Sequence, residues 1–282
     1  MSAPERFAED GDLAFAKYHG AGNDFVLVRY DRAGPHFRDL GAFVRAVCDR
    51  PTGIGADGLI LWTVETNARP RMAYRNADGA PSSFCGNGAR CFVRCLADEL
   101  GGSLAGEPFT FVANDGEHIG QLMPDGRVRV SMHVKGAVTR HSDEADLVDT
   151  GSPHYVTWCG ALPDGDIAAA ARAIRYAEPF AREGVNVNYA AAGQRGAPAQ
   201  LAVRTYERGV EAETLACGTG VTAVALSFAE RRGLTGELDI PVRAVGGDLR
   251  VAFRRLPDGS IADVTLTGPA VRVFAGVWPG SA

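Results

Sequence analysis

The sequence shows no strong excess of one charge. Its 282 residues carry a formal net charge of −5, and lysine and arginine form no block anywhere along the chain. Proteins that bind nucleic acid or an acidic membrane surface usually carry such a basic cluster. We therefore expect neither nucleic acid nor a membrane as a partner. With 46% hydrophobic and 22% charged residues, the composition is that of a globular protein with a sizeable core.

Long apolar runs are also missing. The longest stretch without a charged residue, 214–229, is rich in glycine and threonine, and it is shorter than the roughly 20 apolar residues that span a bilayer. The acidic stretch 1–13 lacks the apolar core of a signal peptide. We therefore expect a cytoplasmic protein whose thiols stay reduced. Residues 1–11 are expected to form a disordered leader.

Matched cysteine pairs of the kind that bind structural zinc do not occur. Six cysteines are present, at positions 48, 85, 91, 95, 159 and 217. Cys91 and Cys95 lie one helical turn apart beside Phe92 and Leu96, which predicts that both belong to the core. We expect no metal and no other cofactor.

One glycine pattern resembles a dinucleotide-binding fingerprint but lacks the strand and helix that the fingerprint requires. The glycine pattern at 53–58, GIGADG, matches G-x-G-x-x-G. That fingerprint needs a strand before it and a helix after it, because the nucleotide phosphates sit on the start of the helix. Here the following residues, LILWTVE, have the pattern of a strand. The stretch is therefore predicted to be a turn-rich loop that lines a cleft.

Glycine is abundant, with 35 residues against a usual share of about 7%, and turn signals separate many short strand patterns. Helical patterns occur at 40–50, about 85–100, 166–176 and 217–232, with Asp166 as the expected N-cap of the third. Strands and helices follow in the same order twice. This order predicts an α/β (α+β) fold of two similar halves, 12–135 and 136–266. The last strand, about 267–282, can rejoin the first half.

One short sequence motif occurs in both halves. The segments SFCGNGARCF and LACGTGVTAV place Cys85 and Cys217, 132 residues apart, on a glycine turn before a helical pattern. The first N–H groups of a helix have no partner within it and carry partial positive charge. A cysteine there is expected to have a thiol pKa below its usual value of about 8.5, beside N–H groups that can bind a carboxylate.

Two such cysteines point to a two-base reaction. A thiolate on one side of a carbon atom can remove its proton, and a thiol on the other side can return one, which inverts the centre without a cofactor. The N–H groups at both helix starts would stabilise the charge that develops on the adjacent carboxylate. A single cysteine is most often a structural residue, but the repeated glycine context favours function for Cys85 and Cys217.

Six ordered motifs from Lys17 to Phe274 resemble the diaminopimelate epimerase family: KYHGAGNDFVLV, RPTGIGADGLI, NADGAPSSFCGNGARC, TGSPHYV, EGVNVNY and YERGVEAETLACGTG. The resemblance implies two pseudo-symmetric domains, each with a curved, mostly antiparallel sheet around a central helix and with the active site in the cleft between them. It implies cofactor-independent conversion of LL- to meso-diaminopimelate, in lysine and peptidoglycan precursor biosynthesis.

The resemblance also assigns roles to individual residues. The acid/base pair falls on Cys85 and Cys217, and His154 with Glu207 is implied to tune the thiols. The residues implied to bind the substrate are Asn23, Asn76, Gly86, Asn87, Ser152, Asn186, Glu207, Arg208, Gly218 and Thr219. Arg208 can hold a carboxylate by two parallel hydrogen bonds, and Glu207 can pair with an ammonium group.

Three departures from the family pattern leave the substrate open. Many members have asparagine where this chain has Ser152, a glutamine of some members corresponds to Gly58, and the stretch 209–216 is one residue longer. A cofactor-independent racemase of another amino acid, such as histidine or proline, is the alternative enzyme. A thiol redox switch or a metal-binding protein is the alternative from another class. The expected partner is a small-molecule substrate, an amino acid, and a homodimer is one expected assembly.

Overall fold

The structure is a computed structural model that describes residues 12–29, 31, 39–64, 69–82, 84–104, 106–193 and 201–279. The predicted leader 1–11 lies outside these residues. The chain folds into two compact units. The first comprises the described residues up to Val128 together with those from Ala270 onward, and the second is Arg129–Pro269. Among the helices of the described residues, none is long and apolar enough to cross a membrane.

In the described residues, the first unit has seven strands and two α-helices. Its strands are β1 (Leu13–Gly20), β2 (Asn23–Arg29), β3 (Gly58–Thr63), β4 (Arg71–Asn76), β5 (Phe109–Ala113), β6 (Gly116–Leu122) and β17 (Val271–Trp278). They pair in the order β17-β1-β2-β3-β4-β5-β6, and β2–β3 and β4–β5 are parallel while the others are antiparallel. The helices are α1 (Leu40–Cys48) and α2 (Gly86–Leu100), with a 3₁₀ turn, η3 (Gly101–Leu104), after α2.

The second unit has the same plan. Its strands are β7 (Val128–Ser131), β8 (Lys135–Arg140), β9 (Ala145–Asp149), β10 (Pro153–Cys159), β11 (Asn186–Ala192), β12 (Leu201–Glu207), β13 (Ala212–Thr214), β14 (Gly236–Ala244), β15 (Gly247–Arg255) and β16 (Ile261–Gly268). They pair in the order β8-β9-β10-β11-β12-β14-β15-β16, with β13 also on β12 and β7 on β16. The helices are α3 (Ala168–Arg175) and α4 (Gly218–Arg232).

The pairing pattern confirms the predicted duplication. In each unit five neighbouring strand pairs alternate between antiparallel and parallel, beginning and ending with an antiparallel pair. The alternation runs through β1-β2-β3-β4-β5-β6 in the first unit and through β9-β10-β11-β12-β14-β15 in the second. The helices occupy the same connections. α1 and α3 each link the strands of the first parallel pair, and α2 and α4 those of the second.

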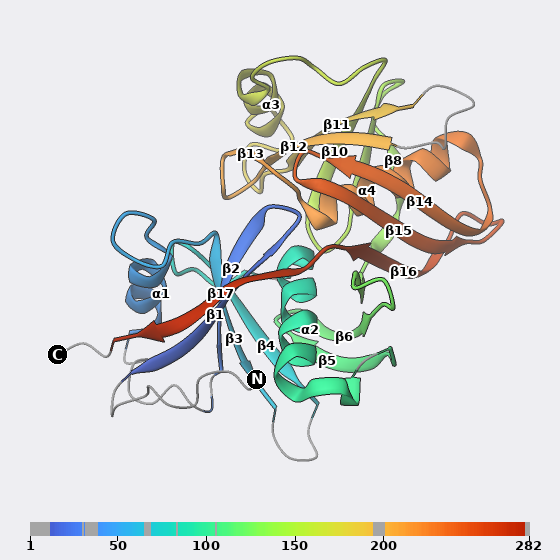
Figure 1. Ribbon diagram of the computed structural model, residues 1–282. Helices are drawn as coiled ribbons and strands as arrows, with labels where there is room; N and C mark the ends of the chain where they lie inside the picture. Colours follow the sequence, from blue (N-terminus) through green and yellow to red (C-terminus); the bar gives the residue numbers. More distant parts are fainter. Residues whose placement is uncertain are drawn as a thin grey trace. The chain divides into compact units, whose positions relative to one another are not determined.

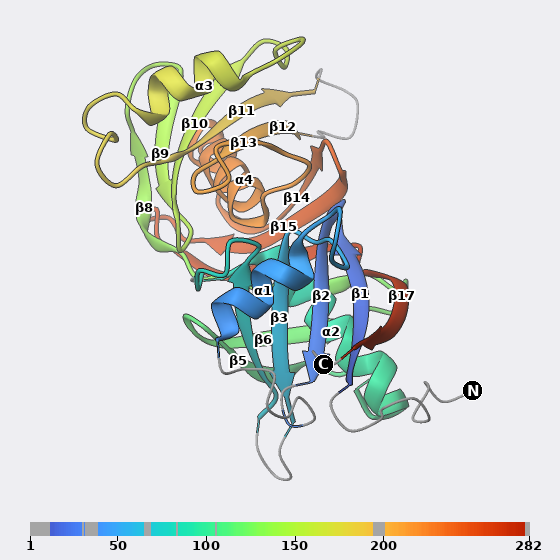
Figure 2. The same ribbon diagram turned by 90° about the vertical axis from the view of Figure 1, so that its left-hand side faces the viewer.

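The second helix of each repeat lies against most of the strands of its unit (Figures 1 and 2). α2 contacts β1, β2, β3, β4, β6 and β17, and α4 contacts β8, β9, β10, β11, β12, β14 and β15. Cys91 and Cys95 of α2 are buried as predicted, and burial raises the pKa of both thiols well above the ordinary range. α4 ends at Gly233, whose φ of 61° is the left-handed cap conformation that glycine favours.

One sequence expectation needs correction, and one strand was not predicted. Ile167, not Asp166, is the residue that precedes the first helical residue of α3, and it makes no side-chain cap bond. The Asp166 carboxylate, one residue further out, still accepts a hydrogen bond from Ala168 N at 2.8 Å at the start of the helix. The region 135–145, where the strand pattern is weak, contains β8 and the start of β9. β8 has no buried residue and pairs with β9, so its sequence lacks the apolar alternation that identifies a half-buried strand.

Candidate active site

Cys85 begins α2 as its N-cap residue, in extended backbone conformation, as the sequence predicts. Its Sγ accepts a hydrogen bond from the N–H of Gly88 at 3.4 Å and lies 3.9 Å from Oδ1 of Asn23. This is the bond that a serine or aspartate makes at a helix start, here accepted by sulfur. Gly86 and Asn87 are the first two residues of the helix. The arrangement points the first N–H groups of α2 toward the thiol and its surroundings.

A buried arginine fixes this helix start. Arg90 is fully buried and donates to Asn87 Oδ1 at 2.9 Å and to Gly86 O at 3.3 Å. Asn87 in turn donates to Asn23 Oδ1 at 3.2 Å. Burial lowers the pKa of Arg90 to about 10, so the guanidinium keeps its charge at neutral pH. A cation beneath the helix start favours negative charge at Cys85. The sequence analysis missed Arg90, because nothing in its spacing separates it from an exposed helical arginine.

Asn23 is held from its other side by a charged cluster. Its amide donates to Asp57 Oδ2 at 2.5 Å, and Asp57 also pairs with Arg50 at 2.8 Å. Neighbouring Asp24 is bound by Lys17 and Arg50. Burial raises the pKa of Asp24, but the hydrogen bonds from these two cations outweigh it and hold the pKa at about 2. The network fixes the Asn23 amide with its oxygen toward Asn87 and Cys85.

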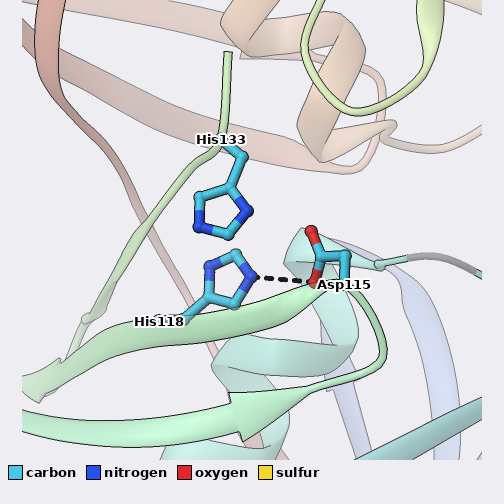
Figure 3. A group of neighbouring side chains, drawn as sticks. All are labelled: Asp115, His118 and His133. Carbon is cyan, nitrogen blue, oxygen red and sulfur yellow. Dashed lines mark hydrogen bonds and ion pairs between the residues drawn. The ribbon is translucent and has the colours of Figure 1, made fainter. Parts of the chain in front are cut away.

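An aromatic stack holds the residue before the thiol. Phe84 stacks on His118 with ring centroids 4.0 Å apart, and His118 stacks on Phe111 at 5.7 Å. His118 Nε2 is 2.9 Å from Asp115 Oδ1, which fixes the imidazole ring (Figure 3). The stack anchors the main chain immediately before Cys85 to the strand pair β5–β6. Phe84 and His118 are 34 residues apart in the chain, so no local pattern predicts their contact.

Asn76 ends β4 at the turn before Cys85. Its backbone N–H donates to Ala80 O at 3.0 Å, and its carbonyl accepts from Gly79 N at 2.9 Å. Gly58 is its antiparallel partner in the sheet. A Cβ atom on Gly58 would lie 2.5 Å from Arg75 O and from the Tyr74 ring. The glutamine that some family members have at this position therefore does not fit the local structure of this chain.

Cys217 is the N-cap residue of α4, also in extended backbone conformation, and it is buried. Its Sγ lies 3.3 Å from Oγ1 of Thr219, and Gly218 is the first helical residue. Thr150 is buried and donates to Thr219 O at 3.0 Å, which ties the first turn of α4 to the end of β9. Both cysteines therefore occupy the same place in their repeat, at the start of its central helix.

Several of the residues predicted to bind the substrate lie together in the second unit. The Asn186 side chain donates to Ser152 Oγ at 2.8 Å and accepts from Arg208 N at 2.9 Å. The Arg208 guanidinium donates to Glu183 O at 2.8 Å and to Ser152 Oγ at 3.3 Å. Glu207 accepts from Thr214 Oγ1 at 3.0 Å. Ser152 thus acts as a link between Asn186 and Arg208.

His154 lies on β10 and is 1% exposed. Burial lowers its pKa to about 3, and the positive charge of Arg208 acts in the same direction, so the imidazole is neutral at physiological pH. Its Nδ1 is 3.1 Å from Nδ2 of Asn188. The sequence analysis missed Asn188, although the spacing in VNVN places it on the same face of β11 as Asn186.

Solved structures share this fold at low sequence identity. A Bacillus anthracis phenazine biosynthesis protein of the PhzF family superimposes with a TM-score of 0.71 and 13% identity, over 95% of this chain and 99% of that one. A hydroxyproline epimerase from Agrobacterium vitis does so with a TM-score of 0.67 and 14% identity, over 96% of this chain and 93% of that one. The fold therefore defines a two-repeat α/β protein of the epimerase and PhzF type.

Sequence comparison identifies the family within this fold class. The family model described as diaminopimelate epimerase matches residues 15–138 and 147–273. A diaminopimelate epimerase of Flavobacterium psychrophilum is 36% identical over 258 residues, covering 92% of this chain and 97% of that protein. One of Archaeoglobus fulgidus is 37% identical over 282 residues, covering 94% and 96%. The chain belongs to the diaminopimelate epimerase family.

Proposed function

We propose that this protein is an isomerase that converts LL-2,6-diaminopimelate to meso-diaminopimelate, in lysine and peptidoglycan precursor biosynthesis. The observation that carries the proposal is the family membership, which rests on relatives matched over more than nine-tenths of the chain. The repeated N-cap cysteine gives the proposal its chemistry, because each repeat supplies one thiol at a helix start. The cytoplasm, where thiols stay reduced, is the proposed location, and assembly as a homodimer stays a prediction.

In the proposed reaction one cysteine, as thiolate, takes the α-proton of the substrate and becomes a thiol. The electron pair left on carbon is delocalised into the adjacent carboxylate as an enediolate. The other cysteine, as thiol, donates its proton to the opposite face of the carbon and becomes a thiolate. The backbone N–H groups of Gly86, Asn87, Gly218 and Thr219 stabilise the enediolate oxygens. The mechanism requires Cys85 and Cys217 to reach opposite faces of one bound carbon atom.

Diaminopimelate has a second amino acid end that does not react. Arg208 and Asn186 are proposed to hold the distal carboxylate, and Glu207 its ammonium group. Their mutual hydrogen bonds support this assignment, since Asn186 accepts from Arg208 N and Arg208 is oriented by Glu183 O. Hydrogen bonds from these side chains to the charged groups of the substrate would contribute more binding free energy than bonds between neutral groups. They would therefore discriminate against substrates that lack the charged distal end. Proline and histidine lack that end, so they are the substrates that test the assignment.

The activity is tested with a panel of amino acids in D₂O. We expect the purified protein to epimerise LL-diaminopimelate and to introduce solvent deuterium at the α-carbon, detected by mass spectrometry. Proline and histidine should show no exchange. Activity should not change on dialysis against EDTA or on treatment with a carbonyl reagent that traps pyridoxal phosphate. Exchange confined to proline or histidine would contradict the substrate, and activity restored only by added zinc would contradict the two-thiol chemistry.

Replacement of Arg208 tests the distal contact. Lysine keeps the charge but cannot make two parallel hydrogen bonds to a carboxylate. We expect Arg208→Lys to raise KM for diaminopimelate by about 10- to 100-fold, the value of one or two charge-assisted hydrogen bonds, with a smaller change in kcat. Arg250→Lys is the matched control, because Arg250 makes a surface pair with Asp239 at 2.7 Å. A fall in kcat with unchanged KM would assign Arg208 to the chemical step instead.

A further inference from the structure

The amide of Asn188 has one defined orientation. Asn188 is fully buried, and its Nδ2 lies 3.1 Å from Tyr155 O and 3.4 Å from Asn186 O. Both are carbonyl oxygens, which can only accept, so the NH₂ group has to face them. On the other side, Thr205 Oγ1 donates to Asn188 Oδ1 at 3.0 Å. A flipped amide would set oxygen against two carbonyls.

This orientation decides which nitrogen of His154 carries the proton. Nδ2 of Asn188, a donor only, lies 3.1 Å from Nδ1 of His154. Nδ1 therefore has to be the acceptor, and the proton of the neutral ring is on Nε2. Nε2 itself is buried and has no hydrogen-bond partner within the described part of the chain. A buried N–H without a partner is costly, so such a group is normally satisfied by water or by a bound ligand.

We propose that Asn188, oriented by Thr205 and two main-chain carbonyls, is a positioning residue that locks His154 in the neutral Nε2–H form. The proposal rests on the proposed function and deepens it. With its Nδ1 lone pair engaged by Asn188, His154 cannot take a proton from a thiol. It acts on the reaction only as a hydrogen-bond donor, through Nε2–H, to an anionic atom such as a thiolate sulfur or a substrate carboxylate oxygen. The transferred protons are then carried by the cysteines alone.

The first turn of α4 leaves room for this lock. A Cβ atom on Gly220, three residues after Cys217, would lie only 2.4 Å from Asn188 Oδ1. Asn188 therefore packs against the helix that begins at Cys217, and the absence of a side chain at Gly220 permits it. The corresponding glycine of the first repeat, Gly88, faces the end of the Ile60 side chain at 3.1 Å instead. The polar lock belongs to the second repeat, and Gly88 offers a matched control.

The lock is tested directly by ¹⁵N NMR of histidine-labelled protein, with the His154 signals assigned by their loss in His154→Gln. We expect two-bond correlations in which Nε2 carries the proton and Nδ1 does not, unchanged between about pH 5 and pH 8, where a histidine of ordinary pKa would titrate. A proton on Nδ1, or a ring that becomes charged in this range, would overturn the proposal.

Asn188→Asp reverses the hydrogen bond while keeping the shape. A carboxylate can only accept, so the His154 proton should move to Nδ1 and the ring should become able to charge. We expect kcat/KM for diaminopimelate to fall by about 10- to 100-fold, as loss of a residue that orients a functional histidine typically does, and its pH profile to gain a new titration. If the mutant keeps the Nε2–H form and the wild-type pH profile, Asn188 does not set the tautomer.

Gly220→Ala tests the same lock without adding a buried charge, in case Asn188→Asp does not fold. Its methyl group should displace Asn188 and shift the His154 signals, with a smaller loss of kcat/KM, whereas Gly88→Ala should leave those signals unchanged. Equal effects of the two alanines on the His154 signals would overturn the proposal. The NMR measurement needs no substrate. A protein that fails to epimerise diaminopimelate but shows the locked ring would contradict the proposed function and not the lock.

Discussion

Cys85→Ser and Cys217→Ser are each expected to lose epimerisation by about 10²- to 10⁴-fold, the range that one acid–base group contributes. A serine hydroxyl is too weak an acid to form an alkoxide base at neutral pH. The cysteine that remains can still take a proton from the isomer whose hydrogen faces it. Each variant should therefore keep some exchange or elimination chemistry on one stereoisomer, and the two variants should prefer opposite isomers.

The measurement is deuterium exchange into LL- and meso-diaminopimelate separately, together with the net rate of epimerisation. Cys159→Ser is the control, because Cys159 is a half-buried thiol on β10, outside the proposed site. Binding should weaken less than the rate in both active-site variants, since the helix starts keep their N–H groups. If both variants prefer the same isomer, or if either epimerises near the wild-type rate, a mechanism with a single catalytic cysteine is the better account.

Mild oxidation is expected to remove nearly all activity, and dithiothreitol to restore it. Two thiols that act on opposite faces of one carbon can approach the Cα separation of a disulfide, about 4.4–6.8 Å. We therefore expect a bridge between Cys85 and Cys217. Oxidation of a cysteine to a disulfide proceeds through its thiolate form. Burial raises the pKa of Cys48 to about 12 and that of Cys91 and Cys95 further, so these thiols should react slowly.

Peptide mapping of the oxidised protein decides the result. The bridge should form equally well in Cys159→Ser, because burial, followed by the charge of Glu144, raises the pKa of the Cys159 thiol as well. In Cys85→Ser and Cys217→Ser no internal bridge at the remaining active-site cysteine is expected. An inactive oxidised protein in which both residues are still thiols, or in which Cys159 is the bridged partner, would rule the prediction out.

The features that the sequence predicted correctly are those with local causes. A glycine-flanked cysteine before a helical pattern begins a helix, because the chain there can satisfy the exposed N–H groups. Cys85 and Cys217 are both N-cap residues in extended conformation, and at Cys85 the thiol itself accepts a bond from the first turn. The order of strands and helices revealed the duplication for the same reason. The local rule was one residue off at α3, where the helix begins at Ala168 although Asp166 still accepts from its first N–H, and it gave no signal at β8, whose exposed residues show no alternation.

The surroundings of each thiol depend on contacts between distant segments. Arg90 looks like any helical arginine in sequence, yet it is fully buried and bonded to Gly86 and Asn87, the two residues after Cys85. His154 and Asn188 are 34 residues apart and meet because β10 and β11 are parallel neighbours in the sheet. Phe84 meets His118 because β6 folds back beside the start of α2.

The sequence by itself determined the two helix-capping cysteines, the repeated order of elements and the family, because these depend on short-range patterns along the chain. Only the tertiary structure decided which charged and amide groups are buried around each helix start. Burial and hydrogen-bond partners are set by sheet register and by packing across 30 or more residues of chain, for which a single sequence carries no local signal. Those groups make the two halves chemically different, with a buried cation beside Cys85 and a neutral histidine in the repeat of Cys217.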